Sequence, residues 1–500
     1  MGNVLISEET LVGIADAIRE KNGLTDLYTP SEMIDAIREI SISSGEGVDP
    51  NKPVRFYGPY GDLVYSYSLS ELNEMTELPI LPEYKGLLGQ SWNWSLDKVK
   101  SVNGEIEIGS LYITDDGETR IYVELSEDSL RPSVGFKQNF AKAVWVDWGD
   151  GTPLSTSDVY GNDIVSIEHE YAEPGNYVIC LIPEESAEIT LIGNSTGTLL
   201  LHKTPSNDSC NTKYSNSIYK IELGKGVSKL SETCLKSERL KSITITESIK
   251  SFGGAFVGCI SLESITFPLG VTQLNRNEFT ECLALEKILF SQNRVTSYHI
   301  QFERCAALKE VVISNDVDAN ICVFSQCSGL KRAVLPHTQE SMSSDSFYNC
   351  KLLKEVIVRG NVTKINDDVF RACSLLEKVN VPDTVTTIGS YAFYSCFLLK
   401  DFRFPSDLVT IGNTAFGNCR SLKKVEIPKG VTSIESQAFI SCDSIVEYRV
   451  YPTVPPKLGN STSIFVPKGC IVYVPKGSLE VYQAAEYWSA FADSMIEMEE

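Results

Sequence analysis

The motif Phe-x-x-Cys-x-x-(Leu/Ile) occurs nine times between residues 256 and 445 and constrains the fold of this 500-residue chain more than any other feature. Its cysteines recur every 23 residues, with one interval of 22, at Cys259, Cys282, Cys305, Cys327, Cys350, Cys373, Cys396, Cys419 and Cys442. A period this regular predicts a solenoid, because one repeat cannot bury its apolar face alone and stacked neighbours must share a core. A solenoid presents a long, regular surface, which favours a binding function.

Each repeat predicts one strand of a parallel sheet. The pattern Leu-x-x-(Ile/Val)-x-(Phe/Val/Ile) stands at 262–267, 376–381 and 422–427. Alternation along a strand places the residues two and four positions after this leucine on the outer face of the sheet. The row at plus two alternates in charge over eight repeats, at Lys287, Glu310, Arg332, Glu355, Lys378, Asp401, Lys424 and Glu447. Neighbouring strands should therefore form lateral ion pairs that fix their register.

The row at plus four supplies the candidate binding surface, which consists of Leu289, Val312, Val334, Ile357, Asn380 and Arg403. Its first four members are apolar neighbours on a face that the pattern predicts to be exposed. Contiguous exposed apolar surface marks contact with a partner. Two alternatives stay open at this point: β-branched residues favour strands in any case, or another domain covers the row.

The charge of the chain is acidic and uneven. The net charge is -22; residues 1–220 carry 15 Lys and Arg against 35 Asp and Glu, whereas residues 221–450 carry 26 against 25. This balance argues against binding to nucleic acid, because Lys and Arg are the residues that neutralise phosphates.

The fourteen cysteines are not expected to form disulfides. The chain has no secretory signal and no apolar run of membrane-spanning length, which predicts folding in a cytoplasm with reduced thiols. The thiols of the ladder should be buried and act as small apolar groups. No metal site or cofactor is predicted, since Cys-x-x-Cys is absent and the four histidines are scattered.

The segments ahead of the repeats predict a multidomain, mainly β chain. Residues 1–45 have the spacing of a helical hairpin, which is too small to form a core alone and should anchor to another protein. Residues 51–108 predict a small β-rich or α+β module with strands at 54–57, 63–67 and 86–94. An immunoglobulin-like β-sandwich is predicted over 109–192, followed by a linker at 193–219, from short strands at 111–114, 120–125, 143–148, 164–171, 177–182 and 189–192.

One stretch of the sandwich carries a resemblance to a known class. Val-Asp-Trp-Gly-Asp-Gly-Thr at 146–152, His-Glu-Tyr at 169–171 and Gly-Asn-Tyr at 175–177 resemble the polycystic-kidney-disease type of immunoglobulin-like domain. A buried tryptophan and a tight Asp-Gly turn agree with that resemblance. Asp147 and Asp150 form a weak candidate calcium site. The alternative is that both carboxylates hold the turn through backbone hydrogen bonds.

The repeats themselves resemble the BspA-like subclass of leucine-rich repeats, found on bacterial cell surfaces and in phage tail proteins. Over residues 220–450 their consensus is Ile-(x)4-Phe-x-x-Cys-x-x-Leu-x-x-Val-x-Val-Pro. A degenerate first repeat at 218–245 and the segment 451–500 are predicted to cap the array, as solenoids require. The C-terminal cap should contain Ile-Val-Tyr-Val at 471–474 and a helix with Trp488 and Phe491.

The N-terminal segment carries a resemblance with functional content. Residues 9–21, Glu-Thr-Leu-Val-Gly-Ile-Ala-Asp-Ala-Ile-Arg-Glu-Lys, and 28–33, Tyr-Thr-Pro-Ser-Glu-Met, resemble the leader of minor structural proteins of gut phages. The resemblance implies a protein of the virion, in a tail fibre or baseplate appendage. Residues 1–45 would then attach to other virion proteins, and the repeats would bind a glycan or protein receptor on the host.

Two other functions stay open: a purely architectural virion component, in the baseplate or as capsid decoration, and a bacterial surface adhesin. Neither nucleic acid nor membrane insertion is expected, and self-association is an open question. An enzyme is not predicted, because Gly-x-Ser-x-Gly, His-Glu-x-x-His and phosphate-binding loops are all absent.

Overall fold

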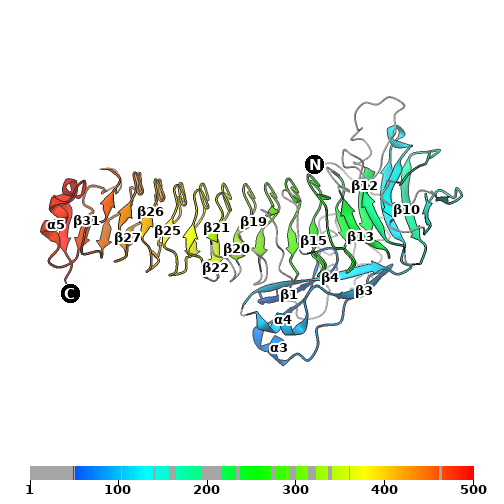
Figure 1. The fold of residues 1–500 in the computed structure, drawn as a ribbon, viewed down its shortest axis with the longest axis horizontal. Helices are drawn as coiled ribbons and strands as arrows, with labels where there is room; N and C mark the ends of the chain where they lie inside the picture. Colours follow the sequence, from blue (N-terminus) through cyan, green and yellow to red (C-terminus); the bar gives the residue numbers. More distant parts are fainter. Residues whose placement is uncertain are drawn as a thin grey trace, which may run out of the picture.

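The computed structural model shows an elongated molecule in which a solenoid joins a two-sheet unit at one end to a helical cap at the other (Figure 1). A small α+β module lies against one side of the solenoid, near the two-sheet unit (Figure 1). The structure describes residues 49, 51–102, 104–138, 142–156, 165–185, 187–192, 217–231, 237–271, 278–291, 300–313, 322–335, 341–359, 361–460, 464 and 466–499. The predicted helical hairpin at 1–45 lies outside these residues, as does most of the predicted linker at 193–219.

The module is a four-stranded sheet in the order β2-β1-β4-β3. Its elements are β1 (Val54–Tyr57), β2 (Leu63–Tyr67), α3 (Leu69–Glu74), β3 (Leu87–Trp92), α4 (Leu96–Ser101) and β4 (Ile106–Thr114). Strands at the first two predicted positions are confirmed residue for residue, and the two short helices were not predicted. Helix α3 begins at a capping box, in which the Ser68 hydroxyl and the Glu71 carboxylate each accept a backbone N–H bond. The predicted boundary between residues 108 and 109 falls inside β4.

The next unit consists of two facing sheets. One contains β5 (Thr119–Leu125), β10 (Gly175–Pro183), β7 (Val144–Asp147) and β8 (Ser155–Thr156); the other contains β11 (Ile189–Ile192), β6 (Ser133–Gln138) and β9 (Val165–Glu168). A short 3-10 helix, η1 (Glu127–Ser129), precedes β6. Trp148 is fully buried between the sheets, and its indole donates to the Ser155 hydroxyl at 2.9 Å. Assignment of this unit to the immunoglobulin or polycystic-kidney-disease class stays a prediction.

Both sheets of this unit continue into the solenoid. Strand β12 (Ile218–Glu222) pairs antiparallel with β5 on one side and parallel with β14 (Ser242–Thr244) on the other. On the opposite layer, β13 (Val227–Ser231) pairs with β11. One continuous cluster of buried apolar side chains runs from Leu111 to Met495. The two-sheet unit therefore closes the N-terminal end of the array, so that the first repeat is covered by more than its own degenerate sequence.

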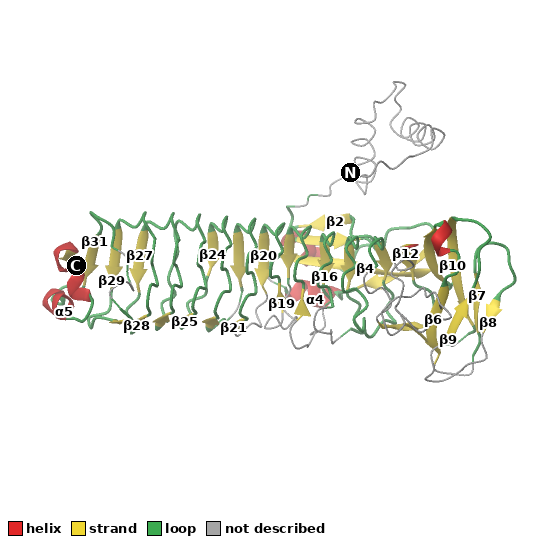
Figure 2. Cartoon of the chain, turned by 90° about the horizontal axis from the view of Figure 1, so that it is seen from above, coloured by secondary structure: helices red, strands yellow, loops and turns green. Residues whose placement is uncertain are grey.

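Two parallel ladders of short strands form the sides of the solenoid (Figure 2). The strands of the first ladder, which we call the main sheet, begin two residues after the predicted leucine position and are hydrogen-bonded in successive groups rather than without a break. They are β14, β15 (Ser264–Thr266), β16 (Lys287–Leu289), β18 (Glu310–Val312), β20 (Arg332–Leu335), β22 (Glu355–Val358), β24 (Lys378–Asn380), β27 (Lys424–Ile427), β29 (Glu447–Val450), β31 (Ile471–Val474) and β32 (Met495–Glu497). The second ladder contains β17 (Ile300–Gln301), β19 (Cys322–Val323), β21 (Ser341–Met342), β23 (Lys364–Ile365), β25 (Thr387–Ile388), β26 (Thr410–Ile411), β28 (Ser433–Ile434) and β30 (Lys457–Leu458). Partners such as Glu355 and Lys378 are 23 residues apart, so the register repeats the sequence period.

The motif residues form two internal ladders. The nine phenylalanines stack along the axis, with ring centroids 5.0–5.8 Å apart, for example 5.5 Å between Phe347 and Phe370. All nine ladder cysteines are fully buried and free, which confirms the prediction. Eight of their thiols donate to the phenylalanine carbonyl of the repeat before, for example Cys373 to Phe347 at 3.0 Å. Burial raises the pKa of the Cys373 thiol far above its ordinary value, so the group is not a nucleophile.

The C-terminal cap combines α5 (Leu479–Ala484), the 3-10 helix η4 (Trp488–Ser494) and β32, which extends the main sheet. Trp488 is buried and donates from its indole nitrogen to the Pro456 carbonyl at 2.8 Å. This arrangement confirms the predicted helical cap with Trp488. Within the described ranges, no helix has the length and apolar character needed to cross a membrane.

Candidate binding surface

The predicted binding row divides into a buried and an exposed part. Leu289, Val312 and Val334 are 0%, 4% and 0% exposed, so the expectation of an exposed apolar surface is wrong for these three residues. Ile357 is half-buried, whereas Asn380 and Arg403 are exposed. At Leu289 the structure bears out the alternative that another domain covers the row, because Gly109 of the module lies against this residue. We call the buried residues Thr244, Thr266, Leu289, Val312 and Val334 the covered face.

The module at 51–114 covers the strands that carry Thr244, Thr266 and Leu289, and its charged side chains reach the strands that carry Val312 and Val334. Strand β4 crosses the outer side of β14, β15 and β16. The approach is close at Gly109, where an added Cβ would lie 2.5 Å from Thr266 Cγ2 and 3.0 Å from Leu289 Cβ. Glycine is therefore required there because any side chain would push β4 away from the sheet. All nine residues of β4 are buried.

Asn93 and Trp94 attach the module to the ends of two solenoid strands. The Asn93 amide donates to the carbonyls of Phe267 and Leu289, both at 3.2 Å, and its oxygen accepts from the Gly109 N–H at 2.8 Å. The Trp94 indole donates to the Phe290 carbonyl at 2.7 Å. Because both side chains are buried, these bonds satisfy polar groups that would otherwise be costly to remove from water.

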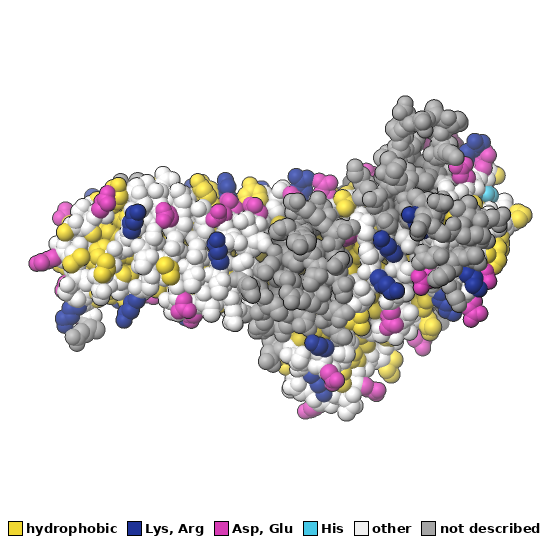
Figure 3. Space-filling view, viewed as in Figure 1, with side chains coloured by type: hydrophobic (Ala, Val, Ile, Leu, Met, Phe, Trp, Pro, Cys, Tyr) yellow, Lys and Arg dark blue, Asp and Glu magenta, His cyan; other side chains and the backbone are white. Residues whose placement is uncertain are grey.

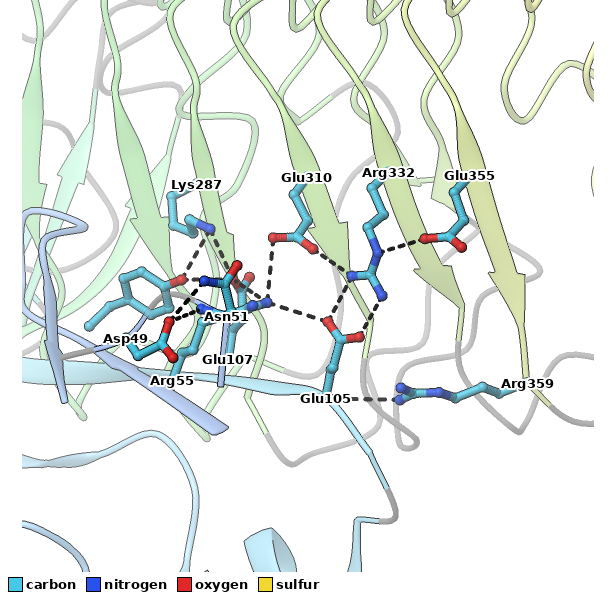
Figure 4. Close-up of polar contacts among 11 residues, drawn as sticks. Asp49, Asn51, Arg55, Glu105, Glu107, Lys287, Glu310, Arg332, Glu355 and Arg359 are labelled. Atoms are coloured by element: carbon cyan, nitrogen blue, oxygen red, sulfur yellow. Dashed lines mark hydrogen bonds and ion pairs between the residues drawn. The ribbon is translucent and has the colours of Figure 1, made fainter. Parts of the chain in front are cut away.

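A network of charged side chains continues the contact toward β18 and β20 (Figure 4). Arg332 donates to both oxygens of Glu105, at 2.5 and 2.7 Å, and also binds Glu310 at 2.6 Å and Glu355 at 3.1 Å. On β16, Lys287 binds Glu107 at 2.9 Å. The charged row at plus two therefore binds carboxylates of the module as well as its own neighbours.

The predicted lateral ion pairs are confirmed at three places in the row: Arg332 with Glu310, Arg332 with Glu355, and Lys424 with Glu447 at 3.8 Å. Only the first two lie beside the module.

Burial shifts the ionisation of this network. Burial itself acts to raise the pKa of Glu105, but its bonds to Arg332 and the nearby guanidinium charges outweigh that effect, and the pKa is lowered. Burial lowers the pKa of Arg359, whose guanidinium donates to the Glu105 carbonyl at 3.3 Å. Glu105 is thus held as a carboxylate between positive groups, which ties the module to the solenoid.

Beyond Ile357 the outer side of the main sheet faces solvent. We call this surface the open face; it consists of Lys378, Asn380, Asp401, Arg403, Lys424, Glu426, Glu447, Arg449, Ile471 and Tyr473. The first six are exposed and the last four are half-buried. Residues 401–403 continue the row without forming a regular strand. The predicted candidates Asn380 and Arg403 both belong to this surface.

The open face has mixed polar chemistry. Arg403 binds Asp383 at 2.6 Å, and the Arg449 guanidinium lies 5.0 Å from the centre of the Tyr473 ring. Lys378, Asp401, Lys424 and Glu447 alternate in sign along the open face, and the side of the solenoid drawn in Figure 3 likewise has no field of one sign. Such a surface suits recognition of a polar partner through many small contacts.

The candidate calcium ligands act within their own turn. Asp147 accepts from the Gly149 N–H at 2.9 Å, and Asp150 accepts from the Thr152 N–H and hydroxyl at 3.1 and 2.6 Å. The second Asp150 oxygen lies 2.6 Å from His169 Nε2. These bonds match the alternative in which the aspartates hold the turn. Across the part of the chain that the structure describes, no three His, Cys, Asp or Glu side chains are grouped to hold a metal ion.

Comparison with known proteins identifies the repeats. Residues 209–254, 228–354 and 340–455 match the model of the BspA type leucine rich repeat region, in six copies. No curated protein matches the chain.

Several solved structures are similar to this chain. They include a leucine-rich repeat protein from Bacteroides ovatus, at 19% identity over 64% of this chain and 97% of that one, with a TM-score of 0.37. The pneumococcal vaccine antigen PcpA matches at 17% identity over 54% and 76%, with a TM-score of 0.34. A leucine rich cell surface protein from Faecalibacterium prausnitzii matches at 20% identity over 60% and 93%, with a TM-score of 0.28. What the comparisons establish is the kind of repeat.

Proposed function

Residues 209–455 are BspA-type leucine-rich repeats, and on that premise we propose that the chain is a non-enzymatic adhesion protein that binds a cell surface through its open face. The observation that carries the proposal is the division of the main sheet. Its first part is occupied by the chain's own module, while the open face has polar and charged side chains on successive repeats, exposed from Lys378 to Glu426 and half-buried beyond. Repeat proteins of this kind bind macromolecules along such extended surfaces.

The proposal extends to the particle that carries the chain. Residues 1–45 attach it to a phage virion, in a tail fibre or baseplate appendage, and the repeats project toward a glycan or protein receptor of a bacterial host. The support is the resemblance of residues 9–21 and 28–33 to phage structural proteins. In the bacterial alternative, the same repeats act as a surface adhesin.

Cell binding tests the function of the open face. The labelled full chain should bind cells of a susceptible gut bacterium, and Arg403→Ala combined with Asn380→Ala should reduce that binding at least tenfold. Arg131→Ala is the matched control: Arg131 is 61% exposed and binds Glu170 at 2.6 Å, as Arg403 is 70% exposed and binds Asp383 at 2.6 Å. Equal binding by both variants would refute a role for the open face.

Antibody labelling tests the location. Antibodies against the chain should decorate the appendages of purified phage particles from an infected culture. Decoration of the bacterial envelope in the absence of phage would favour the adhesin. Decoration of particles whose open face is inaccessible to an antibody against residues 401–430 would favour the architectural role.

A further inference from the structure

A second group of partly exposed side chains lies in the turns that connect each strand of the second ladder to the next strand of the main sheet. We call the edge of the solenoid that these turns form between residues 343 and 420 the ridge. We call Tyr348, Arg371, Tyr391 and Tyr394 the tyrosine cluster. Tyr348, Arg371 and Tyr394 occupy one repeat position, directly after the stacked phenylalanines of three successive repeats. Backbone bonds hold them in register, because the N–H groups that follow Tyr348 and Arg371 donate to the Arg371 and Tyr394 carbonyls, both at 2.8 Å.

The four side chains contact one another closely. The Arg371 guanidinium lies 5.8 Å from the Tyr348 ring centre, 5.3 Å from that of Tyr391 and 5.7 Å from that of Tyr394. The Tyr391 and Tyr394 rings meet edge to face, with centres 5.7 Å apart. Asp368 fixes the guanidinium through a 3.0 Å ion pair. The rings are therefore held in place before any ligand arrives, which lowers the entropic cost of binding.

The backbone at Tyr391 makes the ring there unexpected. Tyr391 has φ of 56°, in the left-handed region, and the equivalent residues Asp345, Asp368, Thr414 and Gln437 have the same conformation. Aspartate tolerates this region better than a bulky side chain does. Tyr391 is also 36% exposed and lies outside the core. Because the Tyr391 side chain neither favours this backbone conformation nor packs in the core, we expect it to have a role on the surface.

A second aromatic and cationic pair lies in the following repeats, on the same ridge. The Arg420 guanidinium is 5.3 Å from the centre of the half-buried Phe397 ring, and its Nε donates to Asn418 at 2.7 Å. The Asn418 amide in turn donates to the Ser395 hydroxyl at 3.1 Å. Aromatic faces and fixed hydrogen-bonding groups are thus both present over the four successive repeats from Tyr348 to Arg420.

From this arrangement we infer that the ridge binds a neutral, linear glycan laid along the solenoid axis. The C–H face of a pyranose ring packs on the negative face of an aromatic ring, while its hydroxyls bond to Arg, Asn and Ser. Successive repeats are about one sugar length apart, as the 5.5 and 5.1 Å spacings of Phe347, Phe370 and Phe393 indicate. Each sugar would therefore meet an equivalent position of the next repeat.

The local charge gives no advantage to an acidic glycan. Asp345, Asp367 and Asp368 match in number Arg371, Arg420 and Lys351, the last of which stands at the same repeat position as Arg420. Burial, followed by the charge of Asp368, raises the pKa of Asp345. A protein partner is disfavoured by size, since a stable protein interface needs roughly 800 Å² from each side and the aromatic strip is a single row on a ridge.

The test uses the full chain with tetrasaccharides as probes. β-linked glucose and N-acetylglucosamine tetramers should bind in calorimetry, and a tetragalacturonate should bind at least tenfold more weakly. Tyr391→Asn with Tyr394→Ala should reduce affinity for the neutral tetramers at least tenfold, because asparagine keeps the left-handed backbone and both rings are lost. Tyr391→Phe should stay within threefold of the parent. Tyr473→Ala, on the open face, should have no effect.

The outcomes separate this inference from the proposed function. If neither neutral tetramer binds, or if Tyr391→Asn with Tyr394→Ala binds as tightly as the parent at an unchanged Tm, the glycan site is refuted. If binding to cells depends on Tyr391 and Tyr394 but is lost after protease rather than periodate treatment of the cells, the ligand is a protein and the inference also fails. Loss of cell binding in Arg403→Ala alone concerns the open face and leaves the ridge unaffected.

Discussion

The covered face and the open face belong to one sheet with one repeat pattern, yet they differ in what surrounds them. Over β14 to β20 the outer row is Thr244, Thr266, Leu289, Val312 and Val334, and every member is buried. From β24 onward the same row reads Asn380, Arg403, Glu426 and Arg449, facing solvent. The core beneath is the same in both halves. The residue types of the outer row therefore depend on what surrounds each part of the sheet, while the residue types of the inner positions depend on the fold, which both parts share.

The largest effect on stability is expected when the module is undocked at Trp94. Trp94→Ala should lower the free energy of unfolding by about 3–5 kcal/mol, because it removes a buried ring. Trp94 is 2% exposed and donates to the Phe290 carbonyl. Urea unfolding followed by fluorescence measures the loss. Trp94→Phe keeps one aromatic ring but loses the hydrogen bond and part of the buried volume, so it should cost about 1–3 kcal/mol, less than Trp94→Ala. An equal loss in both variants would contradict the packing argument.

The charged row offers a second contrast between the halves. Arg332→Ala leaves Glu105, Glu310 and Glu355 without their shared cation and should cost about 2–3 kcal/mol. Lys424→Ala removes the residue at the same repeat position on the open face, where the side chain is 60% exposed and its partner Glu447 is 3.8 Å away. That variant should leave Tm unchanged, since exposed pairs contribute little. Similar Tm shifts for Arg332→Ala and Lys424→Ala would mean that the bonds between Arg332 and the module do not stabilise the protein.

We expect the core to contribute equally to stability beneath the covered face and beneath the open face. Cys327 lies under the covered half and Cys396 under the open half, and both thiols donate to the phenylalanine of the repeat before, at 2.9 and 3.2 Å. Cys327→Ala and Cys396→Ala should each cost about 0.5–3 kcal/mol. The two losses, measured in urea, should agree within about 0.5 kcal/mol. A much larger loss at Cys327 would show that the cover also strengthens the core.

Acid should weaken the covered half selectively. The folded-state pKa of Glu105 is lowered, so its carboxylate stabilises docking fully above the unfolded value of about 4.3. That contribution is lost as pH falls through the lower, folded pKa. Unfolding midpoints between pH 7 and pH 3 should therefore fall less steeply in Glu105→Gln than in the parent. If the midpoints of the parent and of Glu105→Gln fell equally with pH, Glu105 would not be responsible for the acid sensitivity.

The smallest expected effect comes from placing a covered-face residue type on the open face. Asn380→Val gives the open row the residue that stands at Val312 and Val334. Because Asn380 is exposed, Tm should not change, while binding of a hydrophobic dye should rise slightly. A clear gain in Tm would indicate that position 380 is covered in solution.

The period of the sequence was enough to predict the solenoid, because buried Phe, Cys and Leu positions respond to one requirement in every repeat. Strands such as β1 and β2 followed from local alternation of apolar residues. Strand β6 was not predicted, and its segment, Ser-Val-Gly-Phe-Lys-Gln, has a glycine at its centre and few strand-forming residues. The boundary inside β4 was missed because one strand serves two partners, β1 and β3, in succession.

The binding surface was predictable only in part. An apolar row such as Leu289, Val312 and Val334 looks the same in sequence whether a partner or the chain's own module covers it. The signals for the second case lie far away, in the Asn93-Trp94 pair and in Glu105, whose partners are more than 170 residues distant. Asn380 and Arg403 were identified correctly as surface residues because polar side chains in an outward row have no reason to be buried.

The most direct test of the division is thiol accessibility at two positions of the same row. Val312→Cys and Arg403→Cys would each be treated with a membrane-impermeant maleimide in the folded full chain, with the labelling of the parent protein subtracted. Labelling should be rapid at position 403, whereas position 312 should be protected until the protein is unfolded. Equal, rapid labelling at both positions would contradict the covered face and, with it, the assignment of binding to the open half alone.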